Sequence, residues 1–223
     1  MPKLIAVIPA YNEETRIALV VRGVGAYVDE IVVVDNGSSD RTGANAQAAG
    51  ARVIRHVDNS GAGAATMTGI EAARRLGATI IITIDADEQH DPNDIPALLK
   101  PLLEERADIV LPNRFASRNK IPFIRRLFNM AGNVITLLAT GRWVNDSQNG
   151  LKAFGPRAVR EINLRMSGFE FCTEIVRESV QHKWRIVEIP SKVIYSEYSL
   201  AKGQSFANGV RTAFKILLRS FLR

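Results

Sequence analysis

Ile80-Ile81-Ile82-Thr83-Ile84-Asp85-Ala86-Asp87-Glu88-Gln89-His90-Asp91-Pro92 is the stretch that decides the fold. It begins with an almost uninterrupted β-branched run, which is typical of a strand buried on both faces. The run stops at two carboxylates, Asp85 and Asp87, which are one residue apart. Because ligands of open α/β sheets bind outside the carboxyl ends of the strands, we expect both carboxylates to face a binding crevice.

The same carboxylates suggest a metal site. Oxygen ligands this close together, with the amide of Gln89 two residues further on, suit a hard divalent cation that also binds phosphate oxygens. A solvated turn that caps the next helix is the alternative. Asp91-Pro92 already provides a cap and a first helical turn, which leaves Asp85 and Asp87 without a structural role. The pattern therefore favours the metal site.

The composition indicates one globular domain. The chain has 223 residues, of which 46% are hydrophobic and 23% are charged, enough for one sizeable core. Its apolar stretches are much shorter than the roughly 18 residues that a membrane span requires, and the first residues run into a strand without a cleavable leader. The single cysteine, Cys172, excludes an intramolecular disulfide and fits a reducing compartment. We therefore expect a cytosolic protein.

The positive charge narrows the class of partner. The formal net charge is +6, from 29 lysines and arginines against 23 acidic residues. Such an excess favours nucleic acid, anionic lipid or phosphorylated ligands. The basic residues interleave with aliphatic residues more than with aromatic ones, and a nucleic-acid-binding module would leave the carboxylate-ended strands unexplained. We therefore expect no nucleic-acid partner.

Strand and helix patterns alternate along the chain. Strands are expected at residues 4–8, 31–34, 52–56, 80–84 and 109–111, each followed by a helical pattern or a polar turn. This alternation predicts an α/β fold with a mainly parallel sheet and helices on both of its faces. The turn after the first strand lacks the glycine triplet of dinucleotide-binding proteins, which disfavours a nicotinamide or flavin enzyme.

Two other segments are interpreted less directly. The small residues of 59–65 open a helix, and they are equally consistent with an anion site and with close packing. Residues 187–195 are expected to form two short strands on either side of Pro190.

Four motifs carry a resemblance to a known family. They are Pro-Ala-Tyr-Asn-Glu at 9–13, Asp-Asn-Gly-Ser-Ser-Asp-Arg-Thr at 35–42, Asp-Ala-Asp-Glu-Gln-His-Asp-Pro at 85–92 and Asp-Ser-Gln-Asn-Gly-Leu-Lys-Ala-Phe at 146–154. The series resembles that of family 2 glycosyltransferases, and within them it is most similar to the dolichyl-phosphate and polyprenyl-phosphate sugar transferases. The resemblance implies a glycosyltransferase A (Rossmann-like) catalytic domain in residues 1–200. It also implies a nucleotide-diphospho-sugar donor, a divalent metal and a lipid monophosphate acceptor.

The resemblance assigns the donor side of the site. Pro9, Tyr11 and Glu13 match positions that hold the nucleotide, and Asp35 matches the position that reads the base or ribose. Asp85, Asp87 and Gln89 match the positions for the metal and the diphosphate, with Asp85 also counted as nucleotide-binding. Bound Mg²⁺ or Mn²⁺ would neutralise the charge of the nucleoside diphosphate that leaves.

The acceptor side is assigned in the same way. Arg114 resembles an arginine that faces the acceptor phosphate, and Asp146 matches an acidic residue near the acceptor's reacting oxygen. In an inverting transfer to an alcohol this carboxylate would be the general base. Because a phosphomonoester oxygen is already ionised at neutral pH, positioning by Arg114 and the metal matters more than proton removal. Glu174 resembles a family acidic residue at the back of this site, with a helix-face charge as the alternative.

Two more basic residues are assigned to the acceptor phosphate, Arg126 and Lys202. Relatives place an arginine in the loop that closes over the donor, whereas this chain has Lys202 in a different sequence. We therefore expect Lys202 to supply the cation of this loop.

Two segments are candidates for membrane contact. Residues 121–139 are too apolar for an ordinary surface helix and carry Arg125 and Arg126 near their start, which favours an interfacial helix over a buried one. Residues 203–223 predict a C-terminal amphipathic helix with a basic stripe, suited to anionic lipid. A helix docked on the domain or used for dimerisation is the alternative there.

The sequence thus predicts a metal-dependent inverting glycosyltransferase. It would move a hexose such as mannose or glucose from a GDP- or UDP-linked donor to a polyprenyl or dolichyl phosphate. We expect a cytoplasmic protein bound peripherally to the cytosolic membrane face, with a membrane subunit or a homodimer as further partners. The alternatives are a family 2 enzyme with a glycan or protein acceptor and, with less support, a sugar-1-phosphate nucleotidyltransferase. The latter usually has a glycine-rich loop after the first strand, which residues 9–14 lack.

Overall fold

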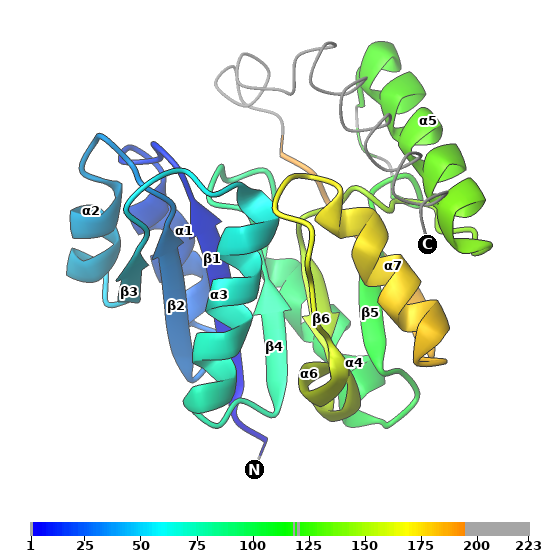
Figure 1. Cartoon of the computed structure of the whole chain (residues 1–223), viewed down its shortest axis with the longest axis horizontal. Helices are drawn as coiled ribbons and strands as arrows, with labels where there is room; N and C mark the ends of the chain where they lie inside the picture. Colours follow the sequence, from blue (N-terminus) through cyan, green and yellow to red (C-terminus); the bar gives the residue numbers. More distant parts are fainter. Residues whose placement is uncertain (1, 118, 120, 195–223) are drawn as a thin grey trace.

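One seven-stranded sheet forms the centre of the molecule (Figure 1). The computed structural model describes residues 2–117, 119 and 121–194. In spatial order the strands are β3 (Arg52–Arg55), β2 (Glu30–Asp35), β1 (Leu4–Ala10), β4 (Ile80–Thr83), β6 (Lys152–Phe154), β5 (Ile109–Asn113) and β7 (Ile186–Pro190). The short β6 runs antiparallel to both its neighbours, β4 and β5, and the other pairs are parallel. The mainly parallel α/β sheet is therefore confirmed.

Helices cover both faces of this sheet, as predicted. They are α1 (Ile17–Gly25), α2 (Thr42–Ala48), α3 (Ala62–Arg75), the 3₁₀ turn η1 (Pro92–Asp94), α4 (Ile95–Leu103), α5 (Phe123–Thr140), α6 (Pro156–Glu161) and α7 (Phe171–Gln181). One hydrophobic core lies between the sheet and α1, α2 and α4. A second lies between the opposite face and α3, α6 and α7. Figure 1 shows α3 and α7 on the near side of the sheet and α1 behind it.

Alternation along the strands explains why the deciding stretch begins with three consecutive isoleucines. Successive side chains of a strand point to opposite faces of the sheet. Ile82 belongs to the core with α1 and α4, while Ile81 belongs to the core with α3 and α7. A strand covered on both sides therefore needs apolar residues at consecutive positions. The strand ends at Thr83, and the following Ile84 is still buried.

The region around Pro190 differs from the prediction of two flanking strands. The structure has one strand, β7, which ends at Pro190, and Val193 forms an isolated bridge with His90. Because β7 is the edge strand, proline at its end does not interrupt a ladder on the open side. β6 and α6 were not predicted. Both are short, and β6 depends on pairing with β4 and β5 rather than on local pattern.

Helix α5 packs with its polar side inward. Its only buried residues are Asn133 and Thr136, and the helix lies against α7. Apolar side chains on its other side are exposed, among them Phe123 (78%), Ile124 (64%) and Leu138 (70%). A helix buried between sheet and solvent would show the opposite arrangement. Within the described residues, no helix is long and apolar enough to cross a membrane. The predicted helix at 203–223 and Lys202 lie outside those residues.

Candidate active site

The loops after β1 and β2 form one side of the site. Ala10 pairs with Asp35 at the ends of the two strands, so the predicted nucleotide-binding motifs begin side by side. The backbone N–H of Glu13 donates to the Thr42 hydroxyl at 2.7 Å, and that of Asn12 donates to the Ser38 hydroxyl at 3.0 Å. Pro9 lies within β1, and Tyr11 is 43% exposed beside the loop. Hydrogen bonds between the motifs thus hold the predicted donor residues at one edge of the sheet.

Asp35 has one oxygen available for a ligand. The carboxylate is buried, and its Oδ1 accepts the backbone N–H of Ser38 at 2.9 Å. Its Oδ2 has no hydrogen-bond partner among the described residues, with Arg55 Nε 3.8 Å away. A buried acceptor without a donor is costly, about 1–3 kcal/mol, so a ligand hydroxyl or N–H at this point would be favourable. This fits the predicted contact with a base or ribose.

The glycine-rich start of α3 is a packing feature. The backbone N–H of Gly63 donates to the carbonyl of Ser167 at 2.7 Å, and the N–H of Ala64 donates to the same oxygen at 3.3 Å. A Cβ at Gly63 would lie 2.0 Å from the Met166 carbonyl oxygen, and one at Gly61 would lie 2.3 Å from that of Ser167. Of the two interpretations of residues 59–65, close packing is therefore the one that the structure supports.

The carboxylates after β4 lie in contrasting environments. Desolvation of its carboxylate raises the pKa of Asp85. The hydrogen bond and charge of His90, together with the charges of Lys152 and Arg114, lower this pKa by more, so the net shift is downward. His90 Nε2 lies 3.3 Å from Asp85 Oδ2. The pKa of Asp87 is raised, first by burial and then by the negative charge of Asp85. A cation beside Asp87 would relieve both effects.

These residues fit a divalent cation that shares its ligands with a substrate. Within the described ranges, no three His, Cys, Asp or Glu side chains come together as a metal site. Mg²⁺ is commonly held by one or two carboxylates together with substrate phosphates. Asp85 and Asp87 could provide the carboxylates. The Gln89 amide Nε2 donates to Asp87, and its backbone N–H donates to Asp87 Oδ1 at 3.0 Å. Gln89 thus orients Asp87 in this structure.

Glu88 fixes the shape of this loop. Its backbone lies in the left-handed region, with φ of +61°, which is uncommon for a residue other than glycine. Its carboxylate forms an ion pair with Arg16, which follows the first motif. The ion pair ties the carboxylate loop to the predicted nucleotide side of the site.

The two predicted catalytic residues contact each other. Arg114 follows β5, and its Nε donates to Asp146 Oδ2 at 2.7 Å, while its backbone N–H donates to the same atom at 3.1 Å. The Asn149 amide also donates to Oδ2, at 2.9 Å. The other oxygen, Oδ1, is buried and has no hydrogen-bond partner in the described part of the chain. Asp146 is therefore held through one oxygen, while the second is buried without a donor.

Lys152 is a site residue that the sequence analysis did not single out. Its side chain is almost fully buried, and its Nζ donates to the Asn149 carbonyl and lies 3.6 Å from Cys172 Sγ. It faces α7 from β6, where its partner on β4 is Thr83. Burial raises the pKa of Cys172, which makes the thiol a poor nucleophile. Charged residues are rarely buried without a role, but nothing in the local pattern reveals this burial.

The remaining predicted residues lie elsewhere. Arg126 is exposed in the first turn of α5, and no described contact links it to Arg114 or Asp146. Glu174 is buried, and its carboxylate accepts the backbone N–H groups of Arg165 and Met166 at 3.0 and 2.8 Å. It thus holds the segment that packs on the start of α3. Its burial contradicts the helix-face alternative, and its place at the back of the acceptor site stays a prediction.

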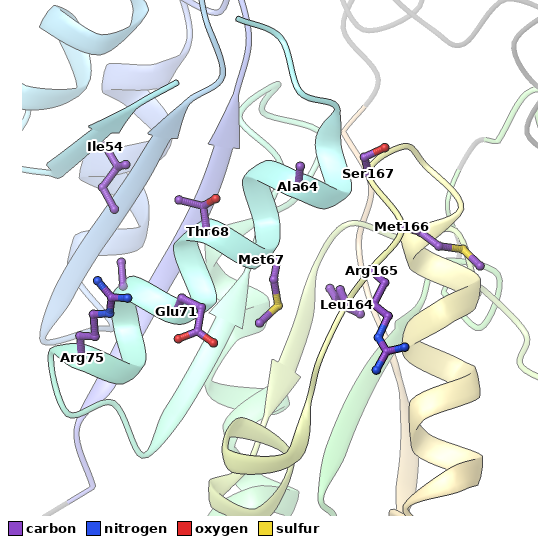
Figure 2. Close-up of a pocket in the computed structure, with 11 residues that line it drawn as sticks. Ile54, Ala64, Met67, Thr68, Glu71, Arg75, Leu164, Arg165, Met166 and Ser167 are labelled. Atoms are coloured by element: carbon purple, nitrogen blue, oxygen red, sulfur yellow. The ribbon is translucent and has the colours of Figure 1, made fainter. Parts of the chain in front are cut away.

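A cavity of about 550 Å³ lies along α3 (Figure 2). Met67 and Glu71 of α3 line one side and Leu164 and Met166 line the other, with Arg75 and Arg165 at the margins. The cavity contains none of the predicted site residues. The cavity is therefore separate from the predicted site.

Comparison with known proteins identifies the family. Residues 5–162 match the model described as glycosyl transferase family 2, which is more than half of the chain.

The chain belongs to this family. It is therefore a family 2 glycosyltransferase, and the predicted enzyme class is confirmed. It is 36% identical over 223 residues to an uncharacterised protein of Methanocaldococcus jannaschii, covering 97% of this chain and 92% of the other. It is 34% identical over 235 residues to the UDP-N-acetylglucosamine–dolichyl-phosphate N-acetylglucosaminyltransferase of Methanococcus voltae, covering 95% and 94%.

Solved structures confirm the fold of this glycosyltransferase. Glucosyl-3-phosphoglycerate synthase from Mycobacterium tuberculosis, in complex with Mg²⁺ and uridine diphosphate, superimposes with a TM-score of 0.76 at 21% identity. The match covers 98% of this chain and 79% of the other. At this identity the likeness concerns the fold alone.

Proposed function

We propose that this family 2 glycosyltransferase moves a sugar from a nucleotide-diphospho-sugar to a polyprenyl phosphate, with inversion at the sugar carbon. The observation that carries the proposal is the buried Arg114–Asp146 pair beside the Asp85–Asp87 loop. It places a cation next to the carboxylates that would hold the donor diphosphate. The Methanococcus relative, which is named for a dolichyl-phosphate acceptor, supports the choice of a lipid phosphate.

On the donor side, the motifs after β1 and β2 would bind the nucleoside. Asp35 Oδ2 would accept a hydrogen bond from the base or ribose, and Glu13, Pro9 and Tyr11 would line the same edge. Asp85 and Asp87 would face the diphosphate. Mg²⁺ or Mn²⁺, when bound there, would neutralise the negative charge of the leaving nucleoside diphosphate.

On the acceptor side, the protein's task is positioning. An ionised phosphate oxygen would attack the sugar carbon, the bond to the donor phosphate would break, and no proton would need to be removed. Asp146 Oδ2 accepts three N–H groups, two of them from Arg114, so the carboxylate is placed to hold this arginine. We infer that Asp146 mainly orients Arg114, whose guanidinium would bind the acceptor phosphate.

Helix α5 supports a lipid acceptor. Seven of its apolar side chains are more than 40% exposed. Exposure of so many apolar side chains on one helix is typical of a surface that contacts another protein or a membrane. A helix with this pattern and a basic first turn suits the boundary between headgroups and acyl chains. We propose that this face contacts the membrane that holds the acceptor, with Arg126 near the lipid phosphates.

A transfer assay tests the proposal. Purified protein with Mg²⁺ or Mn²⁺ would receive radiolabelled UDP- and GDP-sugars and a short polyprenyl phosphate. Label should enter the organic phase with one donor, and Asp87→Ala should abolish this transfer. Asp29→Ala is the matched control, because Asp29 binds the backbone N–H of Leu4 at the opposite end of β1. Hydrolysis of the donor without lipid product would move the acceptor to a glycan or protein. Absence of any donor turnover would contradict the proposal.

A further inference from the structure

Asn133 of α5 forms hydrogen bonds to the backbone on both sides of Asp146, and we call this arrangement the Asn133 bracket. Its side-chain Oδ1 accepts the backbone N–H of Ser147 at 3.0 Å and the hydroxyl of Ser147 at 2.9 Å. Its Nδ2 donates to the carbonyl of Asn145 at 2.7 Å. One buried amide therefore binds the backbone on both sides of the carboxylate residue, and it does so from an element outside that loop.

The rest of the inward side of α5 is also polar. Thr136, one turn further on, bonds to the hydroxyls of Ser147 at 3.2 Å and Thr173 at 3.0 Å. At Gly132 a Cβ would lie 2.9 Å from Gln148 Cγ, so glycine permits the close approach of the loop. A helix that docks only for stability usually turns its apolar side inward. Here the apolar side is outward, and the buried side chains of α5 form hydrogen bonds to the loop of Asp146 and to α7.

We propose that Asn133 is a positioning residue for the transfer step: it fixes the backbone of 145–147 and thereby places the Asp146 carboxylate against Arg114. This inference rests on the proposed role of Asp146 and adds a residue to it. The position of the Asp146 carboxylate matters, because its Oδ2 accepts the Arg114 Nε at 2.7 Å and the Asn149 amide at 2.9 Å. Loss of the bracket would let the loop shift while the donor side, held by β1, β2 and β4, stays in place.

Kinetics of Asn133→Ala test the proposal, with Thr136→Val as the matched control. Both variants remove buried hydrogen bonds from the same side of α5, but Thr136 contacts only side-chain hydroxyls and not the backbone beside Asp146. A displacement of about 1 Å at a reacting group can lower a rate by about 100-fold. We therefore expect Asn133→Ala to lower kcat by about 10- to 100-fold, with KM for the donor and Kd for the nucleoside diphosphate changed less than about 3-fold. Thr136→Val should lose less than about 3-fold.

A double-mutant cycle separates positioning from a structural role. If Asn133 acts through Asp146, Asn133→Ala should change the rate less than about 3-fold in an Asp146→Asn background. Equal losses in both backgrounds would overturn the proposal, as would an unchanged kcat in Asn133→Ala or an equal loss in Thr136→Val. If Asn133→Ala folds poorly, Asn133→Asp takes the place of Asn133→Ala in the cycle. It keeps the acceptor for the Ser147 N–H and removes the donor to the Asn145 carbonyl.

Hydrogen exchange of the Ser147 backbone amide tests the role of Asn133 independently of the proposed transfer activity. The Ser147 N–H should exchange faster with solvent in Asn133→Ala than in Thr136→Val, whether or not an acceptor has been found. Unchanged exchange would overturn the bracket itself. A wild-type protein without transfer to lipid phosphate, or an Asp146→Asn variant with the full wild-type rate, would instead contradict the proposed function.

Discussion

Gly150→Ala is the substitution that the structure predicts most sharply. Gly150 lies against the first carboxylate of the Asp85–Asp87 loop, and a Cβ there would be 1.9 Å from Asp85 Oδ2 and 2.2 Å from Asp85 Cγ. Ordinary contact begins at 3.4 Å, so the carboxylate would have to move by about 1.5 Å. The Gly150 backbone is itself fixed, because its carbonyl accepts the Thr83 hydroxyl at 3.0 Å. The displacement should therefore fall on Asp85.

The expected effect is a loss of function with little loss of stability. A misplacement of about 1 Å can lower activity about 100-fold, which corresponds to about 2.7 kcal/mol of transition-state stabilisation. The Asp85 side chain is 44% exposed, so it can swing into solvent at small cost to folding. We expect the melting temperature to fall by only a few degrees, about 1 kcal/mol or less in a chain of this size.

The assay combines donor turnover, calorimetric titration with nucleoside diphosphate and Mn²⁺, and thermal melting. Gly25→Ala is the matched control, because a Cβ there meets only Ile31 Cδ1 at 3.7 Å. Gly150→Ala should lose turnover and metal-dependent nucleotide binding, while Gly25→Ala keeps both. Wild-type turnover in Gly150→Ala would refute the reasoning that this loop sets the position of Asp85. The reasoning would also be refuted if Gly150→Ala and Gly25→Ala lowered the melting temperature equally and neither lost metal-dependent nucleotide binding.

Further predictions concern charge, stability and the membrane. Asp108→Asn should lower the free energy of unfolding by about 1.5–3 kcal/mol at pH 7, because Asp108 Oδ2 accepts the Arg185 backbone N–H at 2.8 Å and Nε at 3.1 Å. Although burial raises the pKa of Asp108, its hydrogen bonds to Arg185 lower it below 3.8, so the stabilisation is present above pH 3.8. In urea unfolding the difference from wild type should shrink as the pH falls below 3.8, and a difference that stays constant there would contradict the assignment. Lys152→Met should lower kcat at least about tenfold by removing a cation beside Asp85, and it should also lower the melting temperature, because the Asn149 carbonyl loses its donor; an unchanged kcat in parallel melts and turnover assays would contradict this role. The double substitution Phe123→Glu and Leu127→Glu should weaken binding to anionic vesicles at least about tenfold in a sedimentation assay, since burying one large apolar side chain contributes about 1.5–3 kcal/mol. Donor hydrolysis should be unaffected, and Leu19→Glu on α1, where the leucine is 54% exposed, should bind vesicles like wild type.

The sheet could be predicted from sequence because its central strands are buried on both faces. Residues 80–82 are apolar at consecutive positions, and a strand covered on both faces requires that pattern. β6 could not be predicted in the same way. Its three residues include Lys152, and they form a strand because β4 and β5 pair with them from both sides. Non-local pairing of this kind leaves no local pattern to read.

The candidate site divides along the same line. Asp35, Asp85 and Asp87 could be predicted because each lies at or just after the end of a strand, and the carboxyl ends of parallel strands meet at one edge. The contact between Arg114 and Asp146 joins residues 32 positions apart, and only the resemblance to the family brought both to attention. Asn133 lies within an apolar run, where spacing suggests membrane contact rather than a bracket on a loop. Polar residues that act through tertiary hydrogen bonds are the part that sequence does not reveal.

The central claim is that the acceptor is a lipid phosphate positioned by Arg114. The most direct measurement compares two acceptors that differ only in that phosphate, a short polyprenyl phosphate and the corresponding polyprenol, with the same labelled donor and divalent metal. We predict transfer to the phosphate alone, with at least about a 100-fold preference, because only the phosphate is both ionised and able to bind the guanidinium. Equal transfer to the alcohol, or a preference for it, would contradict the claim.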